Sequence, residues 1–114
     1  MSGEQDRNGK SAEQRFAEIR GYFLACMEAA GHARTELYYR PKPGDAREPT
    51  EEELVRRWAG TFAVPVNDIL IGIARAFKLA AERGQVVTSF RYCVPHILNR
   101  FAEMRESRVG EFRG

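Results

Sequence analysis

Apolar residues recur three and four positions apart along most of this chain, and this spacing predicts α-helices. The first helix begins at Ser11, where Ser11 and Gln14 form a capping-box pattern, and it ends near Gly31. Its apolar stripe consists of Phe16, Ile19, Phe23, Cys26, Met27 and Ala30.

A second capping-box pattern, Thr50 with Glu53, follows Pro49 and predicts a short helix. The apolar residues on one face of this helix are Leu54, Val55, Trp58, Ala59 and Phe62.

The next apolar series fits the helical period and stops before Gly84, a residue suited to the left-handed turn that ends a helix. The series consists of Val66, Ile69, Leu70, Ile73, Phe77 and Ala80. We expect this third helix to be the central and most buried element.

The last helix carries an apolar stripe after a cap at Thr88 or Ser89. The stripe consists of Ile97, Leu98, Phe101 and Met104. Pro95 would cost about 3 kcal/mol deep inside a helix, so we expect regular helix to begin near residues 92–94. The chain should fray after Arg108.

The remaining segments lack periodicity. Residues 1–10 are polar and predict a flexible, disordered tail, and residues 109–114 predict a second tail. Three prolines, Pro41, Pro43 and Pro49, follow Gly31 and predict a long loop between the first two helices. Together these segments predict an all-α fold, a single four-helix domain over residues 11–108.

Composition limits the classes of protein that this chain can belong to. Its 114 residues are 43% hydrophobic and 30% charged, enough for one compact domain and too few for a second. The net charge of +2 is too close to neutral for a strongly basic nucleic-acid coat protein. The positive charge is concentrated in residues 69–114, where eight Lys or Arg oppose four Asp or Glu.

No pattern of catalytic or metal-binding residues is present. Cys26 and Cys93 lack metal-ligand spacing and predict buried, reduced thiols. His32 and His96 lie outside any nucleophile motif. No apolar run is long enough to span a bilayer, and the first ten residues lack the apolar segment of a secretory signal. We therefore expect a non-enzymatic cytoplasmic protein with no cofactor, metal site or membrane contact.

The segment from Ala59 to Phe77 has the spacing of a helix-turn-helix motif. Its characteristic positions are Ala59, Ala63, Val64 and Ile69. On the exposed face only Asn67 and Arg75 suit a base edge, and Asp68 would repel phosphates. We interpret the spacing as helix packing in preference to base readout.

A longer stretch, residues 49–105, resembles the C-terminal domain of the DnaD family of bacterial, phage and mobile-element replication-initiation proteins. The resemblance rests on PTEEELVRRWAGTF, on VNDILIGIARAFKLAAERG and on SFRYCVPHILNRF. The family signature places an Ile four residues after a Tyr and a Trp four residues later. Here Tyr92 and Ile97 are five residues apart, and Phe101 stands in the Trp position. The family's N-terminal winged-helix domain has no counterpart.

This resemblance implies a DNA-binding accessory protein of replication initiation or mobile-element maintenance. The DNA that it binds is either single- or double-stranded. The arginine-rich last helix and its neighbours could reach phosphates, and Tyr92 and Phe90 could stack on bases. The predicted DNA-binding residues are Arg75, Lys78, Arg91, Tyr92, Arg100, Arg105 and Arg108. An alternative places Tyr92, Ile97 and Phe101 in the core, which we favour for these three, and pairs the arginines with Glu103 and Glu106.

A second functional class is a protein-interaction or regulatory adaptor module that does not touch nucleic acid. The exposed aromatic and basic residues Tyr38, Tyr39 and Arg40, with the first helix, would bind a replication or regulatory protein. A homodimer through the first helix is also open, because four short helices leave an apolar face that is difficult to cover.

Overall fold

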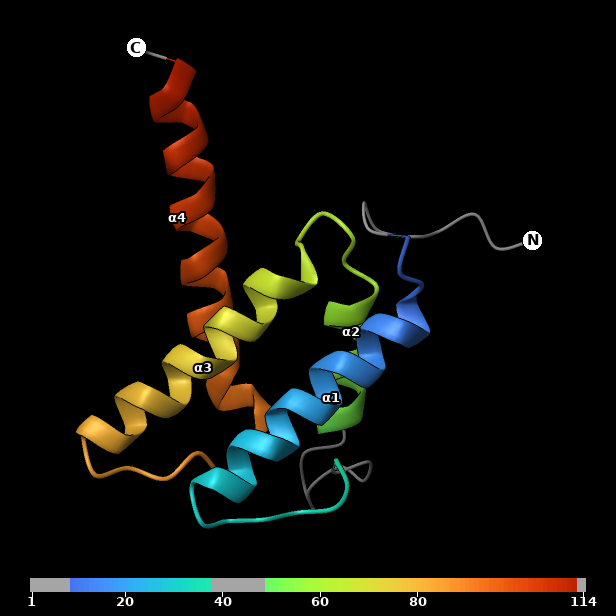
Figure 1. The fold of residues 1–114 in the computed structure, drawn as a ribbon, viewed down its shortest axis with the longest axis vertical. Coiled ribbons are helices and arrows are strands. Elements are labelled where there is room, and N and C mark those ends of the chain that lie inside the picture. The colour runs from blue at the N-terminus through green and yellow to red at the C-terminus, as the bar shows by residue number, and fades with distance from the viewer. Residues whose placement is uncertain (1–8, 38–48, 113–114) are drawn as a thin grey trace.

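Four α-helices and one short 3₁₀ helix form the computed structural model, which describes residues 9–37 and 49–112 (Figure 1). In chain order they are α1 (Ala12–Ala29), α2 (Glu51–Ala59), α3 (Val66–Glu82), the 3₁₀ helix η1 (Phe90–Cys93) and α4 (Val94–Phe112). Side chains are described as far as Arg105. No residue in these ranges lies in a strand, and the all-α, four-helix prediction is confirmed.

The ends of α1 and α3 follow from local sequence signals. The Ser11 hydroxyl accepts a hydrogen bond from the Gln14 amide at 3.2 Å, and the Gln14 side chain accepts one from the Ser11 amide at 2.8 Å. Gly31 after α1 and Gly84 after α3 have φ values of +87° and +67°. These are left-handed conformations that glycine adopts without strain, and each lets the next amide close the last turn.

The turn from α2 into α3 is held by Arg15, a charged side chain of α1 with no exposed surface. Its guanidinium donates hydrogen bonds to the carbonyl oxygens of Ala59 at 2.8 Å, Thr61 at 3.0 Å and Val64 at 2.7 Å. The same group lies 5.2 Å from the ring centre of Phe62. Arg15 thereby satisfies carbonyls at the C-terminal end of α2, where the helix dipole also favours a cation.

The residues with helix-turn-helix spacing mostly belong to the core. Ala59, Val64 and Ile69 are buried, whereas Ala63 is exposed. Such positions are buried in simple helix packing and in helix-turn-helix motifs alike, so the interpretation as helix packing stays a prediction.

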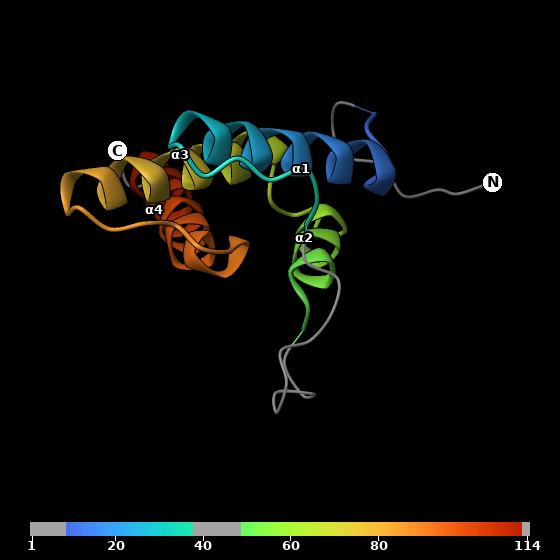
Figure 2. The same cartoon turned by 90° about the horizontal axis from the view of Figure 1, so that it is seen from below.

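The helices form two layers, with α1 and α3 side by side in one and α2 and α4 in the other (Figure 2). The helix α3 packs against α1, η1 and α4, so it is central, as predicted. The largest side chains without exposed surface in the core are Phe23, Phe90, Ile19, Ile69, Ile73 and Ile97. Phe23 meets Phe90 edge to face at a centroid distance of 5.5 Å.

α3 and α4 approach most closely at Gly72. A Cβ atom at this position would lie 2.6 Å from the Cα of Ile97 and 2.8 Å from its backbone nitrogen. Ile97 is fully buried at this contact. The glycine is therefore required because the backbone of α4 occupies the space of a side chain.

The helix α4 begins where the sequence predicts and ends later. η1 leads into Val94, and Pro95 lies in the first turn, where its missing N–H costs little. The predicted end near Arg108 is corrected, because α4 continues to Phe112 and extends beyond the other helices in Figure 1. No proline interrupts this segment, and the single Gly110 does not stop the helix.

Candidate functional site

The cationic side chains predicted to bind DNA are distributed over several environments. Arg75 on α3 is paired with Glu103 on α4 through two hydrogen bonds of 2.6 and 3.0 Å. The bond to Glu103 raises the pKa of Arg75 and lowers the pKa of Glu103. Both side chains are exposed, so water and salt weaken the pair, and a phosphate could compete for this guanidinium.

Arg100 has a less accessible partner. Its Nε lies 3.1 Å from a carboxylate oxygen of Asp68, and the two side chains are 22% and 10% exposed. This pair joins α4 to the first turn of α3. If Arg100 bound a phosphate instead, Asp68, which is less exposed than Arg100, would lose its ion-pair partner. Arg100 is therefore poorly placed to bind DNA.

Arg91 and Tyr92 lie beside the start of α2 and the end of α3 respectively. The Arg91 guanidinium donates to the carbonyl oxygen of Pro49 at 3.3 Å. Tyr92 donates its hydroxyl to Gln85 at 2.9 Å, and its ring stacks on that of His96. Tyr92 is thus engaged by neighbours on both its hydroxyl and its ring.

The core interpretation of the aromatic residues is supported by their burial. Phe90 is fully buried, so it cannot offer a stacking face to a base, and that candidate is corrected. Ile97 is also fully buried, while Tyr92 and Phe101 are partly buried against the core.

Arg105 lies on a different side of α4 from Glu103. Two residues along a helix turn the side chain by about 200°, so Arg105 points away from the Arg75–Glu103 pair. Its guanidinium lies 5.9 Å from the ring centre of Phe101. The side chain of Arg108, together with Tyr38, Tyr39 and Arg40, lies outside the described residues.

The cations predicted to bind DNA are therefore divided into separate groups. Among the five described cations of that prediction, Arg75 and Arg100 are paired with carboxylates, and Arg91 and Arg105 lie in other places. Lys78, one turn beyond Arg75 on α3, remains exposed. The DNA-binding role of these residues stays a prediction.

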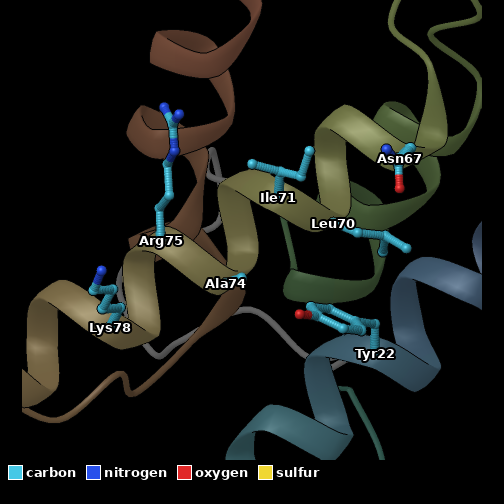
Figure 3. A pocket seen from close by; sticks show the side chains of 7 residues that line it. All are labelled: Tyr22, Asn67, Leu70, Ile71, Ala74, Arg75 and Lys78. Atoms are coloured by element: carbon cyan, nitrogen blue, oxygen red, sulfur yellow. The ribbon is translucent and has the colours of Figure 1, made fainter.

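A shallow apolar groove lies between α1 and α3, on the solvent side of the layer that these two helices form (Figure 3). Its volume is about 320 Å³, and its residues are Tyr22 from α1 with Asn67, Leu70, Ile71, Ala74, Arg75 and Lys78 from α3. Four of these side chains are apolar or aromatic, and both charged ones are cations. Figure 3 shows Tyr22 facing α3 across the groove, with Arg75 and Lys78 toward one end.

Sequence reasoning found the core face of α3 and missed this second apolar area. Leu70 was assigned to the core stripe, yet it is only partly buried, as are Ile71 and Ala74. The available signal was that the apolar residues of 66–80 cover more of the helix circumference than one buried face needs. The contribution of Tyr22 depends on tertiary packing and had no local signal.

The two cysteines are held in their protonated form by burial. Burial raises the pKa of Cys93 far above neutral pH and also raises that of Cys26, so both stay protonated thiols. Cys93 is buried as predicted, whereas Cys26 is half-buried. Over the described residues, no group of three His, Cys, Asp or Glu side chains could hold a metal ion.

No helix in the described part of the chain is both long and apolar enough to cross a membrane. No protein-family model matches the chain, and neither a curated protein nor a solved structure matches it. The DnaD resemblance therefore rests on the sequence segments alone.

Proposed function

We propose that this chain is a non-enzymatic interaction module of the cytoplasm that docks the apolar face of a protein helix in the groove between α1 and α3. The observation that carries the proposal is the composition of the groove, in which Tyr22, Leu70, Ile71 and Ala74 lie together at the surface. Apolar side chains clustered on the surface are typical of protein-binding sites, and a groove between two helices suits an amphipathic helix.

The two helices that form this groove are packed against each other, which favours binding because their backbones do not have to become ordered when a partner docks. On the inner side of α1, Phe23 is fully buried, and its ring lies 5.9 Å from that of Phe77 on α3. Ile73 is also fully buried on the inner side of α3. The helices that carry Tyr22 and Ile71 are therefore held against each other by buried contacts on their inner sides.

A helix-forming peptide with a single leucine stripe tests this proposal, and a peptide with the same residues in scrambled order is its control. We expect the striped peptide of about 15 residues to bind and the scrambled one not to bind. Ile71→Glu should weaken binding at least about tenfold, because it replaces an apolar side chain of the groove with a carboxylate that must lose water when the peptide binds. Fluorescence anisotropy with the labelled peptide measures this.

Leu98→Glu is the matched control, because Leu98 on α4 is 51% exposed and lies outside the groove. It should bind the striped peptide as the unchanged protein does. Equal loss of binding in both variants, or no binding by the unchanged protein at millimolar concentration, contradicts the proposed docking site.

DNA binding in replication initiation or mobile-element maintenance is the second candidate. It is favoured by the two cations at one end of the groove, Arg75 and Lys78, and by the DnaD resemblance of residues 49–105. Arg100 is a poor target for testing it, since Arg100→Glu would place two carboxylates together at Asp68. Lys78 and Arg105 are better targets because both side chains are exposed and no ion pair is seen for either among the residues whose side chains the structure describes.

A salt titration with a DNA duplex and a single strand tests this candidate. Each phosphate contact should contribute a slope of about 0.7 to 0.9 in the logarithmic plot of affinity against salt. If Lys78 and Arg105 make such contacts, Lys78→Glu combined with Arg105→Glu should lower that slope by about 1.4 to 1.8. Arg57→Glu, at an exposed position on α2, should change it little. No binding to either DNA at low salt excludes the candidate.

A further inference from the structure

We infer that the helix docked in the α1–α3 groove is α3 of a second copy of this chain, packed antiparallel to the first. The inference rests on the proposed docking function and adds the identity of the partner. It follows from the order of side chains on the solvent side of α3 and from the distribution of charge along it, and the small size of the groove indicates how strong the association is.

Four groove residues of α3 form a stripe with internal symmetry. Asn67, Ile71, Ala74 and Lys78 are spaced by four, three and four residues, so the spacing is the same in both directions. When two copies of α3 cross antiparallel at the middle of this stripe, Ile71 of each copy faces Ala74 of the other. A large side chain then meets a small one, which is the arrangement that close helix packing requires.

The charges of the groove favour the antiparallel arrangement over the parallel one. Lys78 follows Asn67 by 11 positions, so the two residues are separated by about 16 Å along the helix. Antiparallel packing separates the two Lys78 ammonium groups by about that distance, which exceeds the Debye length of about 8 Å at physiological salt. Each Lys78 then lies beside Asn67 of the partner, whose amide oxygen can accept a hydrogen bond. Parallel packing would place the Lys78 ammonium groups of the two copies close together.

The groove also predicts how strong this association is. Stable interfaces bury about 1,200 to 2,000 Å² in total, and each copy contributes only Tyr22, Leu70, Ile71 and Ala74 as apolar surface. Such a contact belongs with weak and transient interfaces. We expect a dissociation constant on the order of 0.1 to 1 mM.

Sedimentation velocity of the full chain from about 10 µM to about 1 mM tests this inference over the expected range. The average mass should rise with concentration from that of one chain toward twice that value. Ile71→Glu should stay monomeric at every concentration, and Leu98→Glu should associate as the unchanged protein does. Circular dichroism confirms that each variant keeps its helices.

A residue swap tests the antiparallel pairing itself. Ile71→Ala should weaken association, because Ala would face Ala. The double variant Ile71→Ala with Ala74→Ile should restore it, because the large and small residues again face each other across the two copies. A double variant as weak as the single one overturns the proposed pairing.

The outcomes separate this inference from the proposed function. If the unchanged protein stays monomeric at about 1 mM but binds the leucine-striped peptide, the groove docks another protein and the inference is wrong. If the protein neither associates nor binds the peptide, both proposals are wrong. Association that Leu98→Glu removes and Ile71→Glu leaves intact also overturns the inference.

Discussion

Replacing Arg15 by Met should lower the free energy of unfolding by about 3 to 5 kcal/mol, because two or three buried carbonyls that each cost about 1 to 3 kcal/mol would lose their donor. The oxygens of Ala59, Thr61 and Val64 accept from this one guanidinium, and the methionine side chain offers no N–H. The change would also remove a cation from the C-terminal end of α2. Urea unfolding followed by circular dichroism measures the loss.

Arg57→Met is the control for this experiment. Arg57 is exposed on α2, and its replacement should change stability by no more than about 0.5 kcal/mol. An Arg15→Met protein as stable as the Arg57→Met protein would contradict the structural role that we assign to Arg15.

The second large effect concerns the contact between α3 and α4. Gly72→Ala should destabilise the protein by about 3 kcal/mol, at the upper end of the usual cost of overpacking. The new Cβ atom would meet the backbone of Ile97 at 2.6 Å, and a backbone cannot rotate away as the end of a side chain can. Relief requires α4 to move, which loosens the core around Ile97. Thermal unfolding should show a clearly lower midpoint.

Gly21→Ala is the control for this experiment, and we expect it to raise the stability of the protein. Gly21 lies inside α1, and no atom lies within 4 Å of the position that its Cβ would take. Alanine should therefore stabilise the helix by about 0.5 to 1 kcal/mol. If the two glycine variants changed stability alike, the close approach at Gly72 would not be present in solution.

The helices of this protein could be predicted because their signals are local. The Ser11 capping box, the glycines after α1 and α3, and the apolar spacing each act within a few residues. The end of α4 at Phe112 was not predicted, because residues 105–114 contain no apolar stripe and no clear helix-capping residue. Gly110 resembles a stop, yet it lies inside the helix.

The position of Arg15 in the core had a signal that was overlooked. Arg15, Ile19, Phe23 and Met27 follow one another at intervals of four, so the arginine continues the buried stripe of α1. A charge on such a stripe needs partners. Those partners are carbonyls more than 40 positions away, and no local pattern reveals them.

The arrangement of the candidate site could not be read from the sequence for the same reason. Arg75 and Glu103 are separated by 28 positions, and Arg100 and Asp68 by 32. Their pairing depends on how α3 and α4 cross. Counting arginines along the chain gave the local charge correctly, and the sequence offered Glu103 as a carboxylate that pairs with an arginine. It did not show that this arginine is Arg75, or that Asp68 opposes Arg100.

Methyl NMR of the protein during titration with the leucine-striped peptide tests the central claim most directly. The groove predicts that the methyl signals of Leu70, Ile71 and Ala74 shift progressively, while that of Leu98 stays in place. Unchanged groove methyls, or shifts confined to residues around Leu98 and Arg105 on α4, would show that the surface between α1 and α3 is not where this protein binds.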